Sequence, residues 1–334
     1  MTNIPIFDKI ALSYIKPFFM KNYLLRIKKI KKQFAISKEE RFVAAPNGTN
    51  YKVFLSNNYV IRFRDNNPKL LSREANFLKQ LNHALIPKVL WCGEIDQLFF
   101  MVENRLPGKT INLVWKNLSV SNKKNIIEQI VEFLQYQKIQ TKDYVYSVKT
   151  GKKYERFLDY LTDGLKQKAT SIKKFKQTNK IMGDLLLIVN DPEVRNLFTN
   201  KTKSTLVHGD LIIHNLLTDG KNLTGVLDWE LALWGDPDYD LFRLFYYQGC
   251  AKAYQEQGVD ETFESDYMDR LIATILKSDF IKNKKLFQRK YQLVRAIFYL
   301  NALYWATSSD SPEKNINEII VQWDKKSGTK YLRT

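Results

Sequence analysis

Three oxygen-bearing side chains stand at a spacing that suits phosphoryl transfer. Asp210 follows His208 and Gly209 after an apolar run, Asn215 comes four intervening residues later, and Asp228 ends a second apolar run. Phosphoryl transfer needs a carboxylate that orients the attacking hydroxyl and accepts its proton, together with oxygen ligands for the Mg²⁺ that bridges the phosphates of ATP. The interval from Asp210 to Asn215 is that of a kinase catalytic loop, and Asp228 stands where kinases have a magnesium-binding aspartate.

A plain turn is the alternative explanation, because Asp and Asn are common turn formers. An Asn placed four intervening residues after a His-Gly-Asp triplet has a chance expectation of roughly 0.002 in a chain of this size, if each residue type is about one in twenty. The spacing therefore favours the chemical interpretation.

These residues, together with Gly235-Asp236-Pro237-Asp238-Tyr239-Asp240-Leu241, resemble the aminoglycoside phosphotransferase and choline kinase-like family. The resemblance runs from about Arg41 to Tyr304. It implies that Asp210 is the catalytic base and that Asn215 and Asp228 bind Mg²⁺. It also implies supporting roles around the catalytic loop for three residues: His208, Asp236 and Asp240. Where the family often has His, Pro and Gly, this chain has Ile212, Ile213 and His214.

The patterning predicts the α+β class, as a two-lobed protein-kinase-like fold with an antiparallel β-sheet N-lobe that includes one helix and a mainly α-helical C-lobe. Short alternating runs separated by Asn- and Gly-rich turns between Arg41 and Arg105 predict about five hairpin-connected strands. A helix is expected from Pro68 to Asn82, and a helix capped by Ser121 follows the Pro107-Gly108 turn. The expected divisions are 1–40, an N-terminal helical extension; 41–106, the nucleotide-binding N-lobe; and 107–334, the C-lobe with the catalytic loop and acceptor-binding helices.

The N-lobe offers three groups of candidate nucleotide-binding residues. The turn at Asn47, Gly48 and Thr49 is small enough for backbone N–H groups to approach phosphates, although a hairpin turn alone would look the same. Arg62 stands where protein kinases place a phosphate-binding Lys, and Glu74 stands where they place its partner; a surface ion pair of small worth is the alternative. By resemblance, the strand that includes Val102 and Asn104 ends in the hinge whose backbone groups bind adenine.

Acceptor-binding candidates lie in the C-lobe. The stretch from Asp260 to Asp269 carries five acids in ten residues, inside a chain of net charge +18. Such a local reversal of charge would attract a polyamine-like substrate, while a solvated helix start with N-cap acids is the competing explanation. The residues proposed to contact the acceptor are Glu230, Glu264, Asp266 and Tyr267.

Composition limits the partners. The 53 Lys and Arg residues are spread along the whole chain without a nucleic-acid-binding motif, so no specific nucleic acid is expected. Cys92 and Cys250 form no disulfide framework or metal motif, which favours a cytoplasmic location. Charged residues interrupt the apolar N-terminus, so no signal peptide or membrane span is expected. The basic segment from Lys21 to Lys32 is interpreted as a helix docked on the domain, with contact to a membrane surface as the alternative.

The sequence thus predicts a kinase that uses ATP and Mg²⁺ to phosphorylate a hydroxyl of a small molecule. An aminoglycoside or aminocyclitol antibiotic is the favoured acceptor, which would make the protein an antibiotic-resistance enzyme. Choline, a sugar or an amino-alcohol metabolite is the alternative acceptor. A kinase-like binding protein without activity is an alternative of another class, against which stands the joint presence of Asp210, Asn215, Asp228, Arg62 and Glu74.

Overall fold

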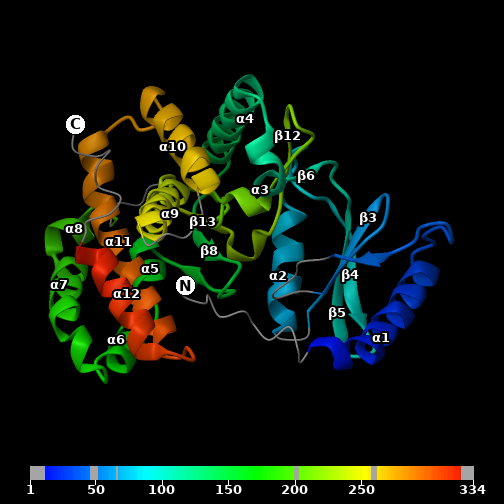
Figure 1. Cartoon of the computed structure of the whole chain (residues 1–334), viewed down its shortest axis with the longest axis horizontal. Coiled ribbons are helices and arrows are strands. Elements are labelled where there is room, and N and C mark those ends of the chain that lie inside the picture. The colour runs from blue at the N-terminus through cyan, green and yellow to red at the C-terminus, as the bar shows by residue number, and fades with distance from the viewer. Residues whose placement is uncertain (1–11, 46–51, 65–66, 199–202, 257–261, 325–334) are drawn as a thin grey trace. The chain divides into compact units, whose positions relative to one another are not determined.

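The computed structural model describes residues 12–45, 52–64, 67–198, 203–256 and 262–324. The chain divides into two compact units, Met1–Leu106 and Pro107–Thr334. The N-terminal unit contains one sheet and the C-terminal unit contains two (Figure 1).

The N-terminal unit is built on one antiparallel sheet of five strands in the order β1-β2-β3-β5-β4. Residues Tyr59 to Arg64 pair with Asn104 to Phe99, which makes β3 and β5 the longest uninterrupted pair. The strands are β1 (Val43–Ala44), β2 (Lys52–Leu55), β3 (Tyr59–Arg64), β4 (Val89–Ile95) and β5 (Leu98–Asn104). The predicted five-stranded sheet is therefore present.

Two helices cover opposite faces of this sheet, α1 (Leu12–Gln33) and α2 (Pro68–Leu78) (Figure 1). Successive side chains of a strand point to opposite faces. Ile61 and Phe63 of β3 share a core with Ile27 of α1, whereas Arg62 between them bonds to Glu74 of α2. The alternation along β3 thus sends its apolar residues to α1 and its one buried arginine to α2. The helix α2 ends at Leu78, four residues before the predicted end at Asn82.

The basic segment of α1 is docked on the sheet. Tyr23, Ile27 and Ile30 are buried in the core of the unit, at the spacing of three and four that gives one helix face. Lys28 and Lys29 are exposed, and Lys29 Nζ donates to Asp96 at 2.6 Å. The lysines therefore form the solvated face of a docked helix.

The C-terminal unit contains two small sheets, which the sequence pattern did not indicate. One has the order β7-β10-β13-β8-β9 and the other the order β12-β11-β6. Their strands are β6 (Lys109–Thr110), β7 (Thr141–Lys142), β8 (Val145–Ser147), β9 (Lys153–Tyr154), β10 (Ser204–Val207), β11 (Leu216–Thr218), β12 (Leu223–Val226) and β13 (Leu233–Gly235). Strand β10 leads directly into the His208-Gly209-Asp210 loop, and the β11–β12 hairpin leads into Asp228.

Helices make up most of the remaining unit, as predicted. They are α3 (Ile111–Val114), α4 (Val120–Ile139), α5 (Phe157–Thr162), α6 (Leu165–Ile172), α7 (Asn179–Asn190), α8 (Pro192–Asn196), α9 (Tyr239–Glu256), α10 (Thr262–Lys277), α11 (Lys284–Ala306) and α12 (Pro312–Asp324). Ser119, not Ser121, caps α4, because its side chain accepts from the Asn122 N–H at 3.2 Å. Aromatic rings of α9 and α11 join these two helices, with Phe242 and Phe287 centred 4.9 Å apart.

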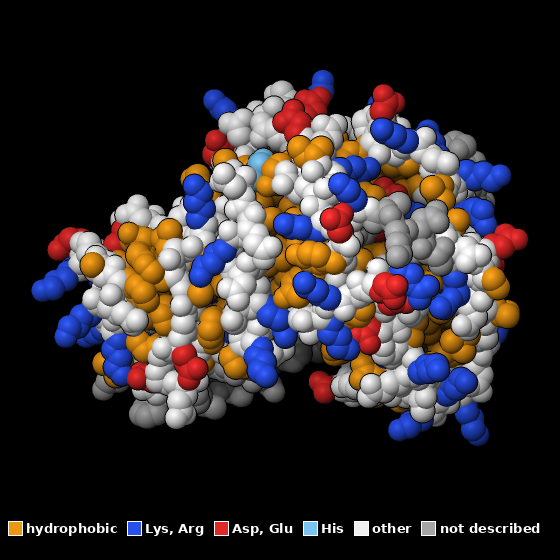
Figure 2. All heavy atoms as spheres, turned by 180° about the vertical axis from the view of Figure 1, so that it is seen from behind, with side chains coloured by type: hydrophobic (Ala, Val, Ile, Leu, Met, Phe, Trp, Pro, Cys, Tyr) orange, Lys and Arg blue, Asp and Glu red, His pale blue; other side chains and the backbone are white. Residues whose placement is uncertain are grey.

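Surface charge shows no single basic patch on the face drawn in Figure 2, where Lys and Arg side chains are spread among acidic and apolar ones. None of the described helices has the length and apolar character needed to cross a lipid bilayer.

Candidate active site

The loop that carries Asp210 is fixed by the start of α9. The carboxylate of Asp240 accepts the backbone N–H of His208 at 2.8 Å and that of Gly209 at 2.7 Å. Gln137 of α4 donates its side-chain amide to the same carboxylate at 3.0 Å. Asp240 therefore contacts the catalytic loop directly.

Gly209 is required by the backbone of this loop. Its φ is +80°, a conformation that L side chains rarely adopt, and a Cβ there would collide with the carbonyl oxygen of Leu231. The loop can therefore pass close to the segment after Asp228 only with glycine at this position.

His208 is a buried structural link between the loop and the segment that leads to Asp228. Its Nδ1 accepts the N–H of Asp210 at 3.1 Å, so the proton lies on Nε2, which donates to the carbonyl of Leu227 at 2.9 Å. Burial lowers the pKa of His208, although the charges of Asp240 and Asp210 act in the opposite direction. Both nitrogens are thus used by the neutral ring, which orients the loop.

The lowered pKa of His208 makes stability depend on pH. Its ordinary pKa is 6.5, so below that pH the unfolded chain binds a proton that the folded ring resists. Stability should be fully present above pH 6.5 and should fall on acidification, by at most about 1.4 kcal/mol per pH unit from this group. We expect His208→Asn to flatten this part of the profile in urea titrations at a series of pH values.

His83→Gln is the control, because burial also lowers the pKa of His83, which lies in the N-terminal unit and outside the catalytic loop. The control should leave the His208 contribution in place. If the free energy of unfolding depends on pH in the same way for the wild type and His208→Asn, His208 is not held neutral by burial.

Asn215 and Asp228 are joined through the backbone. Asn215 Nδ2 donates to the carbonyl of Asp210 at 2.9 Å and to its Oδ2 at 3.0 Å, which turns the amide oxygen away from that carboxylate. The N–H of Leu227 donates to the Asn215 carbonyl at 2.7 Å, so Asp228 immediately follows a residue bonded to Asn215. Asp228 itself has φ 64°, a left-handed conformation that Asp tolerates better than most residues.

An amide oxygen and a carboxylate in this arrangement fit Mg²⁺. That ion takes oxygen ligands, usually one or two from protein side chains, and completes its shell with water and phosphate oxygens. Residues held in uncommon backbone conformations cluster at functional sites, and Asp228 is such a residue.

In the N-terminal unit, Arg62 and Glu74 form a buried bidentate pair. Arg62 Nη1 and Nη2 donate to the two oxygens of Glu74 at 2.7 Å and 3.0 Å. Glu103 of β5 lies 3.8 Å from Arg62 Nη1. The side chains of Arg62 and Glu74 are 9% and 0% exposed, so the pair is not the surface ion pair considered as the alternative.

Breaking this pair should destabilise the protein strongly. Arg62→Met leaves the buried carboxylate of Glu74 without its guanidinium, a loss of about 3–5 kcal/mol in the free energy of unfolding for such pairs. In Arg62→Met/Glu74→Leu the unpaired charge of Glu74 is gone while Glu103 still lacks its neighbouring cation, so urea titrations should show partial recovery of stability. If the single and double variants are equally stable, the pair does not carry the energy assigned to it here.

The other nucleotide candidates are placed only in part. Asn47, Gly48 and Thr49 lie outside the described residues. Val102 is buried between its sheet partners Ile61 and Trp91. Asn104 is tied to Lys88, because its N–H donates to the Lys88 carbonyl at 3.1 Å and its Oδ1 accepts the Lys88 N–H at 2.6 Å.

Comparison with known proteins identifies the family of the chain. The model of the phosphotransferase enzyme family matches residues 45–270, which is more than half of the chain. The chain belongs to this family. One curated relative, hygromycin-B 4-O-kinase of Escherichia coli, is 32% identical over 77 residues, which cover 23% of this chain and only 20% of that relative.

Solved structures show that the phosphotransferase has the fold of aminoglycoside kinases. A ternary complex of a thermostable mutant of aminoglycoside phosphotransferase APH(4)-Ia with ADP and hygromycin B has a TM-score of 0.63 at 15% identity, over 90% of this chain and 98% of that one. The gentamicin complex of APH(2")-IIa has a TM-score of 0.61 at 17% identity, over 91% and 97% of the two chains. The predicted kinase-like fold and family resemblance are confirmed.

The described acidic side chains of the segment from Asp260 to Asp269 make internal contacts. Asp266 accepts from Trp115 Nε1 at 3.0 Å and from Arg270 Nε at 2.7 Å. Tyr267 is 0% exposed and packs edge-on against Trp115, so in this structure it is a core residue and does not present its ring to an acceptor. Glu264 lies in α10, and its side chain is outside the described part of the structure.

Glu230 occupies a different environment from the acidic segment. It lies within electrostatic range of Lys149. The pKa of Lys149 is lowered, mainly by burial and then by the charge of Arg243, while the charges of Glu230 and Asp210 oppose this shift. Of the predicted acceptor residues with described side chains, Glu230 is therefore the one tied to the surroundings of Asp210.

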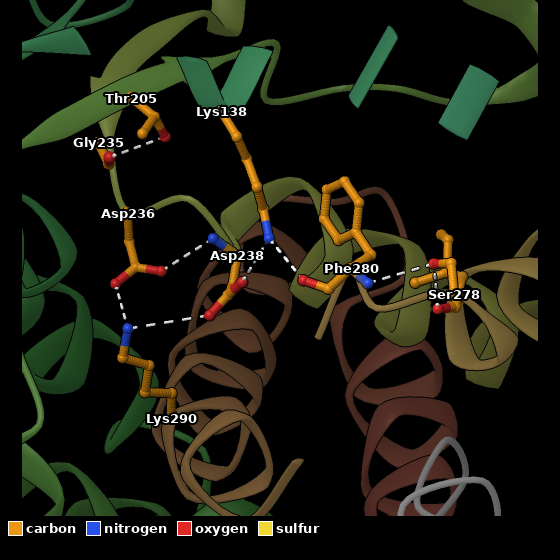
Figure 3. A network of polar contacts seen from close by, with 9 residues as sticks. Lys138, Thr205, Gly235, Asp236, Asp238, Ser278, Phe280 and Lys290 are labelled. Atoms are coloured by element: carbon orange, nitrogen blue, oxygen red, sulfur yellow. Dashed lines mark hydrogen bonds and ion pairs between the residues drawn. The ribbon is translucent and has the colours of Figure 1, made fainter. Parts of the chain in front are cut away.

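Asp236 supports the start of α9 by a route that the sequence did not predict. Its carboxylate accepts from Lys290 Nζ of α11 at 2.7 Å and from the Asp238 N–H at 3.0 Å (Figure 3). Lys138 of α4 lies 3.6 Å from Asp238 and donates to the carbonyl of Phe280 at 2.9 Å. These contacts link the start of α9 to α4 and α11.

Two residues that the sequence analysis did not assign contact the carboxylate of Asp210. Arg243 Nη2 and the Tyr247 hydroxyl each lie 3.0 Å from Asp210 Oδ1. Both belong to α9, three and seven residues after Asp240, and that spacing places all three on one helix face. This spacing from Asp240 was the one feature of the sequence that could have indicated that Arg243 and Tyr247 lie near the catalytic loop.

Proposed function

We propose that this phosphotransferase transfers the γ-phosphate of MgATP to a hydroxyl of a small molecule. The observation that carries the proposal is the joined arrangement of Asp210, Asn215 and Asp228. One carboxylate is held by three hydrogen bonds, and the amide oxygen of the adjacent Asn215 is turned away from it. The ADP and hygromycin B in the complex of a structural relative support nucleotide and hydroxyl-bearing ligands for this fold.

In the proposed reaction, Asp210 accepts a hydrogen bond from the acceptor hydroxyl and directs its oxygen at the γ-phosphorus. The oxygen–phosphorus bond forms as the bond from the γ-phosphorus to the bridging oxygen breaks, and the electron pair leaves with ADP. The hydroxyl proton passes to the Asp210 carboxylate. Bound through Asn215 and Asp228, Mg²⁺ would neutralise charge on the phosphates.

Arg62 is assigned to the phosphates of ATP, with Glu74 as the residue that holds it. Arg62 stays cationic and offers a planar set of donors, two of which Glu74 already fixes. The turn at Asn47, Gly48 and Thr49 is assigned to the phosphates, and the hinge after Val102, including Asn104, to adenine; both assignments come from family resemblance.

We assign the acceptor to the aminoglycosides or aminocyclitols, with Glu230 as the carboxylate that meets an amino group. The relative that phosphorylates hygromycin B and the two solved relatives with aminoglycoside ligands support this class. A less cationic hydroxyl compound, such as a sugar or an amino alcohol, is the second candidate, because Asp266 is already paired internally. The proposed location is the cytoplasm, where ATP is available.

The test is release of ADP from MgATP in the presence of hygromycin B, other aminoglycosides, choline, homoserine and simple sugars. Acceptor-dependent ADP release that requires Mg²⁺ would support the proposal and identify the acceptor class. ATP binding without turnover for any acceptor or for water would favour the alternative of a kinase-like binding protein.

A further inference from the structure

The carboxylate of Asp210 has most of its acceptor positions filled. Oδ1 receives Arg243 Nη2 and the Tyr247 hydroxyl, each at 3.0 Å, and Oδ2 receives Asn215 Nδ2 at 3.0 Å. Each carboxylate oxygen has about two lone-pair sites, so among the residues that the structure describes these three donors leave one position, and that position is on Oδ2. A hydroxyl that donates to this carboxylate must therefore approach Oδ2.

We infer that Arg243 and Tyr247 are positioning residues that hold Oδ1 of Asp210 and thereby present Oδ2 to the acceptor hydroxyl. The inference rests on the proposed function and adds to it the direction of hydroxyl approach. Neither residue touches the reacting atoms in this assignment; both act through Asp210.

Arg243 is held in place by more than Asp210. Its guanidinium lies over the rings of Tyr247 and Phe298, with the central carbon 5.3 Å and 5.8 Å from the ring centres. Arg243 Nη2 also contacts the Tyr247 hydroxyl directly. The two rings therefore hold the guanidinium independently of Asp210. Arg243 can thus fix the orientation of the Asp210 carboxylate.

The Tyr247 hydroxyl stays protonated at neutral pH and can donate a hydrogen bond. Burial is the main cause that raises its pKa to about 12, with the charge of Asp210 adding to this and Arg243 opposing it. The protonated hydroxyl can thus donate to Oδ1 at neutral pH.

One face of α9 consequently controls both the backbone and the side chain of the catalytic residue. Asp240 accepts the N–H groups of His208 and Gly209, while Arg243 and Tyr247 donate to the carboxylate that follows. Since the barrier for a group transfer rises steeply with misalignment, loss of these donors should reduce turnover more than nucleotide binding.

The test compares Arg243→Met, Arg243→Lys and Tyr247→Phe in the wild-type and Asp210→Asn backgrounds. The measured quantity is ADP release from MgATP, with hygromycin B as acceptor and with water alone. We expect Arg243→Met to lower kcat by about 10-fold to 100-fold with little change in the KM for ATP, Tyr247→Phe to lower it less, and Arg243→Lys to restore part of the loss. Because both residues act through Asp210, neither substitution should lower the residual rate of Asp210→Asn further.

Arg289→Met is the matched control, since Arg289 lies on α11 and pairs with the exposed Glu193. It should leave turnover unchanged. Equal reductions of kcat in the wild-type and Asp210→Asn backgrounds would overturn the positioning role. A higher KM for ATP with an unchanged kcat would overturn it as well. Absence of turnover by the wild type with water and with every acceptor of the panel would instead count against the proposed function, so the two failures are distinguishable.

A second measurement does not depend on turnover. Arg243→Met should lower the thermal unfolding midpoint, because it leaves a partly buried carboxylate without its cation, and adding Asp210→Asn should recover part of that loss. A double variant whose loss equals the sum of the single losses would show that Arg243 and Asp210 are not coupled.

Discussion

Replacing Asp210 with Asn should lower kcat by at least about 100-fold, which is the lower range for a positioned general base. The amide cannot accept the hydroxyl proton, and it offers only one oxygen to donors. Asn has nearly the same size, and the loop backbone is held by Asp240 and His208, so the fold should be retained. The measurement is steady-state ADP release with MgATP and the best acceptor, together with circular dichroism.

Asp184→Asn is the matched control for this prediction. Asp184 is exposed on α7 and is not part of the catalytic loop, so the same chemical change there should leave kcat unaltered. Turnover of Asp210→Asn near that of the wild type would refute the assignment of Asp210 as the base.

Replacing Asp228 with Asn should lower kcat/KM for ATP by about 100-fold or more, since removal of a metal-site charge weakens stabilisation of the transferring phosphate. Asn tolerates the left-handed backbone that Asp228 adopts, so this change removes charge without imposing backbone strain. The apparent affinity for Mg²⁺ should fall as well. A titration of rate against Mg²⁺ concentration at saturating ATP measures this effect.

Asp228→Ala provides the comparison, because Ala lacks both the oxygen ligand and the tolerance for positive φ. It should be less stable than Asp228→Asn and at least as inactive. A Mg²⁺ dependence in Asp228→Asn that matches the wild type would contradict the metal-binding role.

The sequence was informative where a local pattern reflects a local constraint. The strands β2, β3 and β5 are short runs rich in β-branched, aromatic and other apolar residues, and α4 repeats apolar residues every three or four positions, so these elements were predicted. Strands β6 to β9 have two or three residues each, too few for any periodicity, and they were missed. Their pairing depends on partners far away in the chain.

The buried face of α10 was missed although its pattern was available. Tyr267, Leu271 and Ile275 recur every four residues and are all 0% exposed. Tyr267 was predicted to contact the acceptor because acidic residues surround it in the sequence. The apolar stripe, in contrast, indicated that Tyr267 belongs to the core.

The contacts of Asp210 illustrate what a single sequence lacks. Arg243 and Tyr247 are separated from Asp210 by 33 and 37 positions, and no motif links them to it. Their relation to Asp240 on one helix face becomes meaningful only once Asp240 is known to bind the loop.

The most direct test of the account follows the γ-phosphate itself. ATP that carries a radioactive label in the γ-phosphate is incubated with the protein, Mg²⁺ and each acceptor, and the label is located after separation of the products. We predict that the label moves to a hydroxyl-bearing acceptor with wild-type protein, and that transfer is lost on chelation of Mg²⁺ and in Asp210→Asn. Label that stays in ATP with every acceptor and with water, although ATP binds, would contradict the claim that this chain is an active kinase.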